Sequence, residues 1–449
     1  MDPPPPRKRV CADPNPGWTA APWAGVPHPN LGAGSGPASR ATATPPPPPR
    51  FGASEDADVR DRSTADASTS ERAVAAALEP VAWDAYFDEK LDVRGESDAD
   101  VFRVYARRGG ERVGRRSDRL HDATATETDA STRAAGENKT ETVVLFAHGC
   151  AYTALSWATT IANLATRVDS SVVLAAFDAR HHGATRVSPR EKINDGVDDE
   201  TSDVEVDVSA ERLARDVASV ARAVAGHFSP SQTGTKENGS MDSEARNRNR
   251  PPKLVLVGHS MGGAAVARAA AMISECPSAY DFDLRGVALV DVSENGGARE
   301  TLRATETFLA KRPKEFATKT DAVAWFVRSG LTTNLASARV SAPSQIRRVT
   351  GTEENDRLDR FVWILDARAT APHWRGWFEG LSRTFLSAKC AKLLVLAGVD
   401  RLDDELTIAQ MQGKFQTVLV PGAGHAVHED EPRATADAIA GFVKRFARA

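Results

Sequence analysis

Long hydrophobic runs are absent from this 449-residue sequence, and no stretch approaches the roughly 20 apolar residues that a transmembrane helix needs. The N-terminus also lacks the apolar core of a secretory signal. Cysteine is scarce: Cys11, Cys150, Cys276 and Cys390 lie far apart, without the close pairs of a zinc site or a redox motif. We therefore expect reduced thiols, no membrane partner and a cytoplasmic or nuclear location.

An excess of either charge is also absent. The chain has 57 basic and 61 acidic residues and a net charge of −4, which gives no basis for nucleic-acid binding. Hydrophobic residues make up 41% of the sequence, enough to bury a sizeable core. The length allows one large domain or two medium ones.

Composition divides the chain into a tail and a folded region. Residues 1–72 are rich in Pro, Ala, Gly, Ser and Thr, and such a segment buries too little apolar surface to offset its ordering entropy. We expect this tail to be disordered and residues 73–449 to form one domain. Within that domain, the polar stretches 108–140, 187–206 and 229–252 are predicted to be insertions.

Short apolar runs alternate with amphipathic helical patterns in the folded region. Strands are predicted at 101–105, 143–146, 172–177, 254–257, 287–290, 393–396 and 418–420, and helices at 156–168, 210–228, 261–274 and 432–446. Continuous apolar runs separated by helices are typical of a mostly parallel sheet covered on both faces, so the predicted class is α/β. A longer helical region, about 298–390, is predicted to form a cap over the carboxyl edge of the sheet.

A nucleophile motif follows one of these strands directly. Gly258-His259-Ser260-Met261-Gly262 has the G-x-S-x-G pattern, with an apolar strand before it and an Ala-rich helix after it. This context is that of the nucleophile elbow, in which a tight turn exposes the serine at the top of an α/β-hydrolase sheet. We therefore predict the α/β-hydrolase fold with Ser260 as the nucleophile.

The serine needs a base and an orienting acid. His425 follows the last predicted strand and is the predicted base, with His428 as its competitor. The acid follows either the penultimate strand, as Asp400 or Asp403, or the strand after the nucleophile helix, as Asp291. All of these positions lie at the carboxyl edge of the sheet, and their spacing does not choose between them.

The backbone amides of Met261 and Cys150 are the predicted oxyanion hole, since the loop beginning His148-Gly149-Cys150 follows the first central strand. We expect His148 to shape this loop, Cys150 to be a small buried residue and Asp178 to brace a neighbouring turn. This chemistry requires neither a metal nor an organic cofactor.

Several segments beyond the elbow resemble the protein phosphatase methylesterase family. The similar segments are Pro80–Phe87, Thr153–Ala158, Trp374–Ser382, Leu396–Asp403, Gln410–Gln416 and Gly424–Asp430. The resemblance implies a serine carboxylesterase that hydrolyses the methyl ester on the C-terminal leucine of the type 2A protein phosphatase catalytic subunit. That subunit would be the partner, and we expect the enzyme itself to be a monomer.

The resemblance also bears on the site. The family's acid lies in a strand-end motif that matches Val290-Asp291-Val292, which favours Asp291 and leaves Asp400 as the alternative. The family's oxyanion loop is richer in glycine than Gly149-Cys150-Ala151, which leaves less conformational freedom here. Competing hypotheses are another α/β-hydrolase activity, such as a lipase or thioesterase, and a non-catalytic inhibitor that binds the phosphatase.

Overall fold

The computed structural model describes residues 76–110, 140–187, 206–229, 251–294, 299–350, 359–398 and 402–447. The predicted tail, most of the three predicted insertions and Asp400 lie outside these residues. No helix in these ranges has the length and apolar character needed to cross a membrane. Cys150 and Cys390 are free thiols, as expected.

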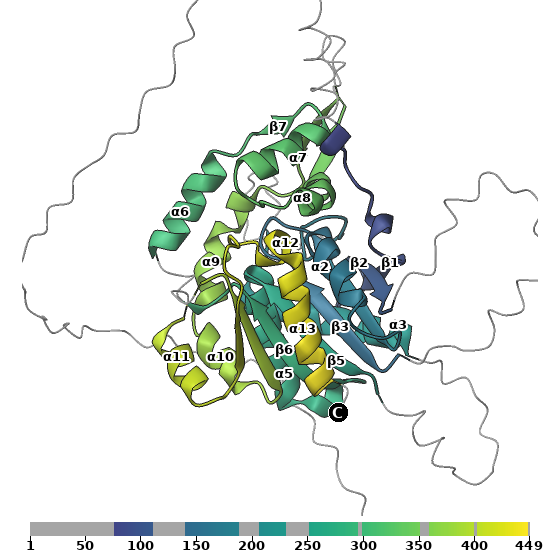
Figure 1. Cartoon of the computed structure of the whole chain (residues 1–449), viewed down its shortest axis with the longest axis vertical. Coiled ribbons are helices and arrows are strands. Elements are labelled where there is room, and N and C mark those ends of the chain that lie inside the picture. The colour runs from purple at the N-terminus through teal and green to yellow at the C-terminus, as the bar shows by residue number, and fades with distance from the viewer. Residues whose placement is uncertain are drawn as a thin grey trace, which may run out of the picture. The chain divides into compact units, whose positions relative to one another are not determined.

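An eight-stranded sheet forms the centre of the fold, in the order β1-β2-β4-β3-β5-β6-β10-β11 (Figure 1). The six strands from β4 to β11 are parallel, whereas β2 is antiparallel to β4 and β1 is antiparallel to β2. The predicted α/β-hydrolase class is confirmed. The strands are β1 (Glu89–Arg94), β2 (Val101–Arg108), β3 (Thr142–Ala147), β4 (Val172–Phe177), β5 (Lys253–His259), β6 (Asp283–Val290), β10 (Ala391–Leu396) and β11 (Gln416–Leu419).

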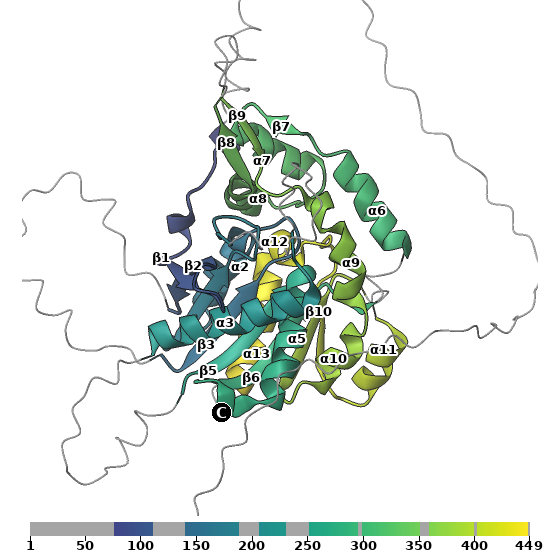
Figure 2. The ribbon, with the colours of Figure 1, turned by 180° about the vertical axis from the view of Figure 1, so that it is seen from behind.

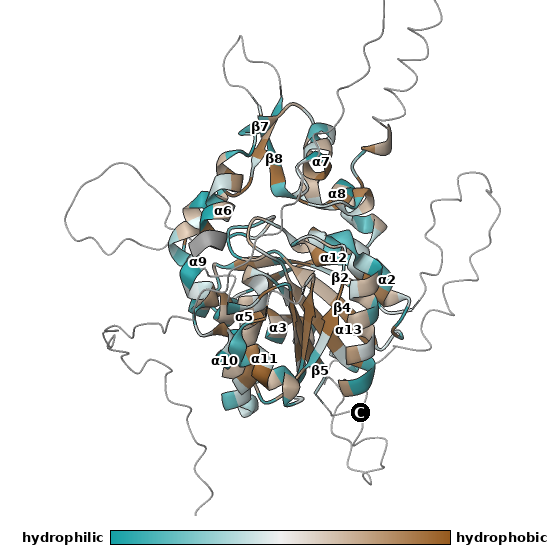
Figure 3. Ribbon diagram, turned by 60° about the vertical axis from the view of Figure 1, so that its left-hand side comes forward, coloured by the Kyte–Doolittle hydropathy of each residue, from teal (hydrophilic) through white to brown (hydrophobic). Residues whose placement is uncertain are grey.

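Helices cover both faces of this sheet because the central strands are apolar on both sides. In β3, Val143 and Leu145 join one buried cluster, whereas Val144 and Phe146 join another. Helices α3 (Ala210–Phe228) and α5 (Met261–Glu275) pack in the first cluster, and α2 (Ala158–Ala165) and α13 (Pro432–Phe446) in the second. Figures 1 and 2 show these pairs from opposite sides, and Figure 3 shows the hydrophobic strands between them.

The described chain between β6 and β10 (residues 299–350 and 359–387), which we call the cap, mostly forms a layer over the carboxyl edge of the sheet (Figure 1). Its last helix, α10 (Leu381–Ser387), instead packs with α5 in the first buried cluster. The cap was predicted to be helical, but it also contains a three-stranded antiparallel sheet, β7-β9-β8. The strands are short, and β9 contributes Phe361 and Trp363 to small buried clusters with α7. The elements are α6 (Arg299–Ala310), β7 (Glu315–Phe316), α7 (Lys319–Arg328), α8 (Leu335–Ser341), β8 (Ile346–Val349), β9 (Arg360–Trp363), α9 (Ala371–Phe378) and α10 (Leu381–Ser387).

Two further elements complete the carboxyl edge. Helix α11 (Asp404–Met411) joins β10 to β11, and the short α12 (Val427–Asp430) precedes α13. The loop between β11 and α12 carries His425, which therefore lies at the same edge of the sheet as the ends of β5 and β6.

Candidate active site

Ser260 occupies a strained turn between β5 and α5. Its backbone has φ 51° and ψ −120°, a conformation that a non-glycine residue adopts only when its surroundings enforce it. The turn is tight enough that a Cβ on Gly258 would lie 2.3 Å from the carbonyl oxygen of Gly262. A Cβ on Gly262 would lie 2.5 Å from the Ala147 carbonyl oxygen, so the elbow requires a glycine at both positions. The turn presents Ser260 at the carboxyl edge of the sheet.

His425 and Asp291 form the central contact of the site. Nδ1 of His425 donates to Oδ2 of Asp291 at 2.7 Å, although the two residues are 134 positions apart. The Asp291 side chain is fully buried, and its other oxygen accepts a hydrogen bond from the Ala397 amide at 3.2 Å. The Asp291 backbone also has a positive φ, 48°, directly after β6. The carboxylate is thus held by the sheet, and it fixes the imidazole orientation.

The competing residues have other surroundings. Asp403 caps α11 by accepting from the Leu406 amide at 2.8 Å and also binds the Ser382 hydroxyl, so its carboxylate serves the fold. His428 is fully buried, its ring lies 4.1 Å from that of Trp157, and burial lowers its pKa to about 3. A buried imidazole that resists protonation is poorly suited to act as a general base.

The oxyanion loop adds a third residue with a positive φ to the site. Ala151 has φ 63°, and its amide donates to Nε2 of His182 at 3.0 Å, so this amide is not free for a ligand. Met261 is the first residue of α5, where helix amides have no intrahelical partner. The amides of Met261 and Cys150 remain the candidate oxyanion donors, as the sequence predicts.

Cys150 itself is not suited to act as a nucleophile. Its Sγ lies 3.3 Å from the Thr370 hydroxyl, and burial raises the pKa of the thiol to about 11. At neutral pH the residue is therefore a neutral thiol that lines the cavity.

Two buried histidines hold the oxyanion loop in place. His148 Nδ1 lies 2.7 Å from the Gly149 carbonyl oxygen, and its Nε2 accepts from the Ala179 amide at 2.9 Å. His182 has the same arrangement, with Nδ1 2.7 Å from the Arg180 carbonyl oxygen. Each ring therefore carries its proton on Nδ1, and burial lowers the pKa of both, that of His182 to about 4. Neutral imidazole rings that are hydrogen-bonded through both nitrogens hold the loop in place and do not carry protons.

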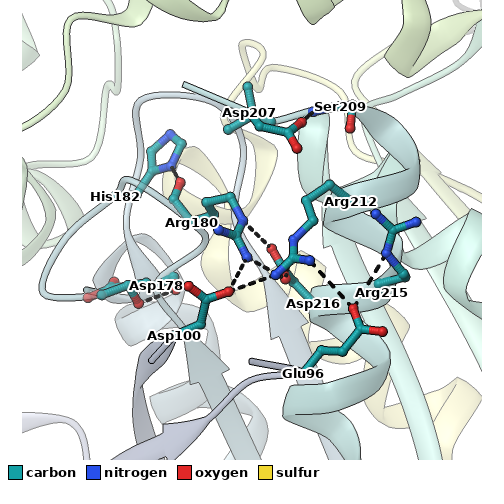
Figure 4. A network of polar contacts seen from close by, with 12 residues as sticks. Glu96, Asp100, Asp178, Arg180, His182, Asp207, Ser209, Arg212, Arg215 and Asp216 are labelled. Atoms are coloured by element: carbon teal, nitrogen blue, oxygen red, sulfur yellow. Dashed lines mark hydrogen bonds and ion pairs between the residues drawn. The ribbon is translucent and has the colours of Figure 1, made fainter. Parts of the chain in front are cut away.

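Arg180 connects this loop to the rest of the fold. Its guanidinium forms ion pairs with Asp216 of α3 and with Asp100, each at 2.8 Å (Figure 4). Asp100 also pairs with Arg212 at 2.7 Å, which extends the buried network across α3. Asp178 braces the adjoining turn by accepting from two backbone amides, those of Ala154 and Ala184, both at 2.8 Å. A role for Asp178 was expected from the sequence, whereas the position of His182 was missed because it depends on contacts between distant segments.

A cavity of about 630 Å³ opens onto Ser260 and His425. Most of its walls are apolar and come from the cap, including Trp374 and Trp377, which are only 4% and 3% exposed. The Trp374 indole donates to the Thr370 hydroxyl and the Trp377 indole to the Val208 carbonyl oxygen. These hydrogen bonds fix both side chains in the cavity wall. The cavity wall also includes Cys150, Tyr152, Ser260, Arg312, Gln345 and His425. Within the described ranges, no group of His, Cys, Asp and Glu has the arrangement of a metal site.

Known proteins resemble this chain in both sequence and fold. A model of the alpha/beta hydrolase family matches residues 144–438. Protein phosphatase methylesterase 1 of Rattus norvegicus is 35% identical over 404 residues, which cover 82% of this chain and 85% of the relative. Probable protein phosphatase methylesterase 1 of Caenorhabditis elegans is 34% identical over 380 residues, covering 84% and 81% respectively.

Solved structures extend the likeness to the fold alone. The crystal structure of E-2-(acetamidomethylene)succinate hydrolase matches with a TM-score of 0.50 and 19% identity, covering 79% of this chain and 100% of its own.

Proposed function

The chain belongs to the protein phosphatase methylesterase family of α/β hydrolases and is a carboxylic-ester hydrolase, and from this premise we propose that it removes the methyl ester from the C-terminal leucine of the type 2A protein phosphatase catalytic subunit. The observation that supports this most directly is the 2.7 Å contact between His425 and Asp291 beside the strained Ser260. These three residues are the proposed catalytic triad.

The proposed reaction begins with attack of Ser260 Oγ on the ester carbonyl. His425 takes the hydroxyl proton on Nε2, because its Nδ1 proton is held by Asp291. The amides of Met261 and Cys150 donate to the developing oxyanion, and removal of one such donor typically costs roughly 10²–10³ in rate. His425 then returns the proton to methanol as it leaves.

Water completes the cycle. It attacks the acyl-enzyme with His425 again acting as base, and the products are the free leucine carboxylate and Ser260 in its original state. His425 accepts and returns the proton in both half-reactions, so the hydrolysis needs no other acid or base.

The cavity suits the proposed substrate in size and polarity. A leucine side chain is apolar, and the apolar walls contributed by Leu302, Phe308 and Trp377 offer it a matching surface. The cap therefore supplies the surface toward the phosphatase tail, while the sheet supplies the chemistry. We also propose that the enzyme is a monomer and that it acts on the phosphatase in the cytoplasm or the nucleus.

The test combines a substrate assay with an active-site probe. We expect the full chain to demethylate a leucine methyl-ester peptide, and a fluorophosphonate probe to label the wild type but not Ser260→Ala. Efficient turnover of short acyl esters with no demethylation would instead indicate another esterase or thioesterase. No labelling of the wild type would indicate a non-catalytic phosphatase-binding protein.

A further inference from the structure

Arg312 is a charged side chain in the wall of the active-site cavity that the hydrolytic steps do not use. It follows α6, and it lines the same cavity as Ser260 and His425. Its Nε is buried without a hydrogen-bond partner, and among the described residues its guanidinium forms no ion pair. The side chain as a whole is half-buried. Partial burial of a guanidinium without an anionic partner is costly, and a ligand carboxylate would supply the missing charge.

Asp366 does not neutralise Arg312. Asp366 is close enough to influence its pKa, but the Asp366 carboxylate is paired with Arg368 at 2.8 Å. Burial lowers the pKa of Arg312 to about 10, so the guanidinium still carries its charge at neutral pH. Cys150 and Tyr152, also near Arg312, are neutral at that pH because burial raises the pKa of each.

The orientation of Arg312 is fixed by an aromatic platform. The guanidinium carbon lies 3.5 Å from the ring centre of Trp363, which gives a cation–π contact. The Trp363 indole is itself anchored by donation to the Pro313 carbonyl at 2.7 Å. Stacking holds one face of the guanidinium, and because Nε is buried, the end formed by Nη1 and Nη2 is the part left for a carboxylate.

A second unpartnered polar atom lies in the same wall. Gln345 is only 4% exposed, and its Nε2 donates to the Ser341 hydroxyl at 3.1 Å, but its Oε1 has no partner. This oxygen has almost no accessible surface, so a ligand would reach it only if the side chain turned toward the cavity. Arg312 is therefore the group that offers the cavity a donor for a carboxylate.

We propose that Arg312, held on Trp363, is a carboxylate-binding residue of the active-site cavity. The carboxylate has two sources, an acidic side chain in the tail before the leucine or the leucine carboxylate that hydrolysis releases. The inference rests on the proposed function for the identity of the peptide, and the geometry of Arg312 stands apart from it.

The first experiment addresses the side-chain source. N-acetylated leucine methyl-ester peptides carry Glu or Gln at each of the three positions before the leucine, and kcat/KM is measured for each pair. We expect one Glu peptide to be preferred by about 10–100-fold, the range of a hydrogen bond to a charged group. Arg312→Met should bring this ratio close to one, whereas Arg375→Met should preserve it, because Arg375 is an exposed arginine of the same cap that does not line the cavity.

The second experiment addresses the product carboxylate and does not need demethylation. N-acetyl-leucine and N-acetyl-leucinamide compete with a fluorophosphonate probe for Ser260. If the product is the ligand, N-acetyl-leucine should protect Ser260 from the probe about 10–100-fold better than N-acetyl-leucinamide in the wild type and in Arg375→Met. In Arg312→Met the two compounds should protect Ser260 equally. Where the Met variant lacks a cooperative melting transition, the neutral Arg312→Gln replaces it.

The two proposals fail in different ways. No preference for the carboxylate in either experiment, or a preference that survives Arg312→Met, overturns the role of Arg312 even if the peptides are demethylated. Absence of demethylation by the wild type overturns the proposed function, while protection from the probe still reports on Arg312.

Discussion

Asp291→Asn is the substitution that tests the proposed triad most directly. One carboxylate oxygen accepts from His425 Nδ1 at 2.7 Å, and the other accepts from the Ala397 amide at 3.2 Å. In the variant, the asparagine oxygen must stay on the Ala397 amide, since two N–H groups would otherwise face each other. The asparagine NH2 then points at Nδ1, and His425 must accept there and carry its proton on Nε2.

The magnitude follows from that tautomer. With a proton on Nε2, the imidazole cannot take the Ser260 proton, and the same change in a chymotrypsin-type triad lowers kcat about 10⁴-fold. His425 is 49% exposed, so water can compensate part of the lost interaction. We therefore expect kcat to fall about 10³–10⁴-fold, equivalent to roughly 4–5.5 kcal/mol in the barrier.

The assay is peptide demethylation together with the rate of fluorophosphonate labelling. Thermal melting checks that the variant is folded, and Asp400→Asn is the matched control because Asp400 is the alternative acid. We expect Asp400→Asn only to weaken turnover. A larger loss for Asp400→Asn than for Asp291→Asn would show that the triad assignment is wrong.

Three further outcomes are expected. Burial raises the pKa of Glu429 to about 8, so between pH 5 and 7 this residue is ionised in the unfolded chain but protonated in the native state, and its contribution to the unfolding free energy falls by about 1.4 kcal/mol per pH unit. Buried histidines such as His182 and His428 contribute with the opposite sign. The slope of unfolding free energy against pH should therefore differ by about this amount between the wild type and Glu429→Gln in urea unfolding. Asp430 accepts from the amides of Gly424 and Thr333, each at 2.7 Å, so Asp430→Asn should cost about 1–3 kcal/mol in urea unfolding and lower kcat, because Gly424 precedes His425. Ala151→Gly should raise the unfolding free energy by about 0.5–1 kcal/mol, since relief of the positive φ exceeds the added chain entropy. These expectations would be contradicted by an unchanged pH slope in Glu429→Gln, by unchanged stability in Asp430→Asn, or by a loss of stability in Ala151→Gly.

Features encoded by neighbouring residues were predictable from the sequence. The predicted helix 210–228 coincides with α3, and the elbow at Ser260 follows from five consecutive residues between a strand and a helix. Strand β1 was not predicted, because its burial alternates along the strand, as in a half-exposed edge strand, and it has no continuous apolar run. The short strands of the cap were missed for a related reason, since β8 and β9 have only four residues each.

Features that depend on contacts between distant segments were not predictable in the same way. Spacing left Asp291, Asp400 and Asp403 open as the acid, because the choice depends on which oxygen reaches His425 in three dimensions. Arg312 could not be distinguished from an ordinary surface arginine, since its burial results from stacking on Trp363, 51 positions away. The sequence contains both residues but does not show that they meet.

The connection of the cap to the sheet has a consequence for evolutionary divergence. The cap leaves the sheet after β6 and returns at β10, and these two strands are neighbours. It is therefore a single excursion of the chain, and changes in its length or sequence need not alter the register of the strands that carry Ser260 and Asp291. Substitution of cap residues such as Arg312 or Trp374 can therefore give a descendant of this protein activity toward a new ester substrate, while the proposed hydrolytic centre stays unchanged.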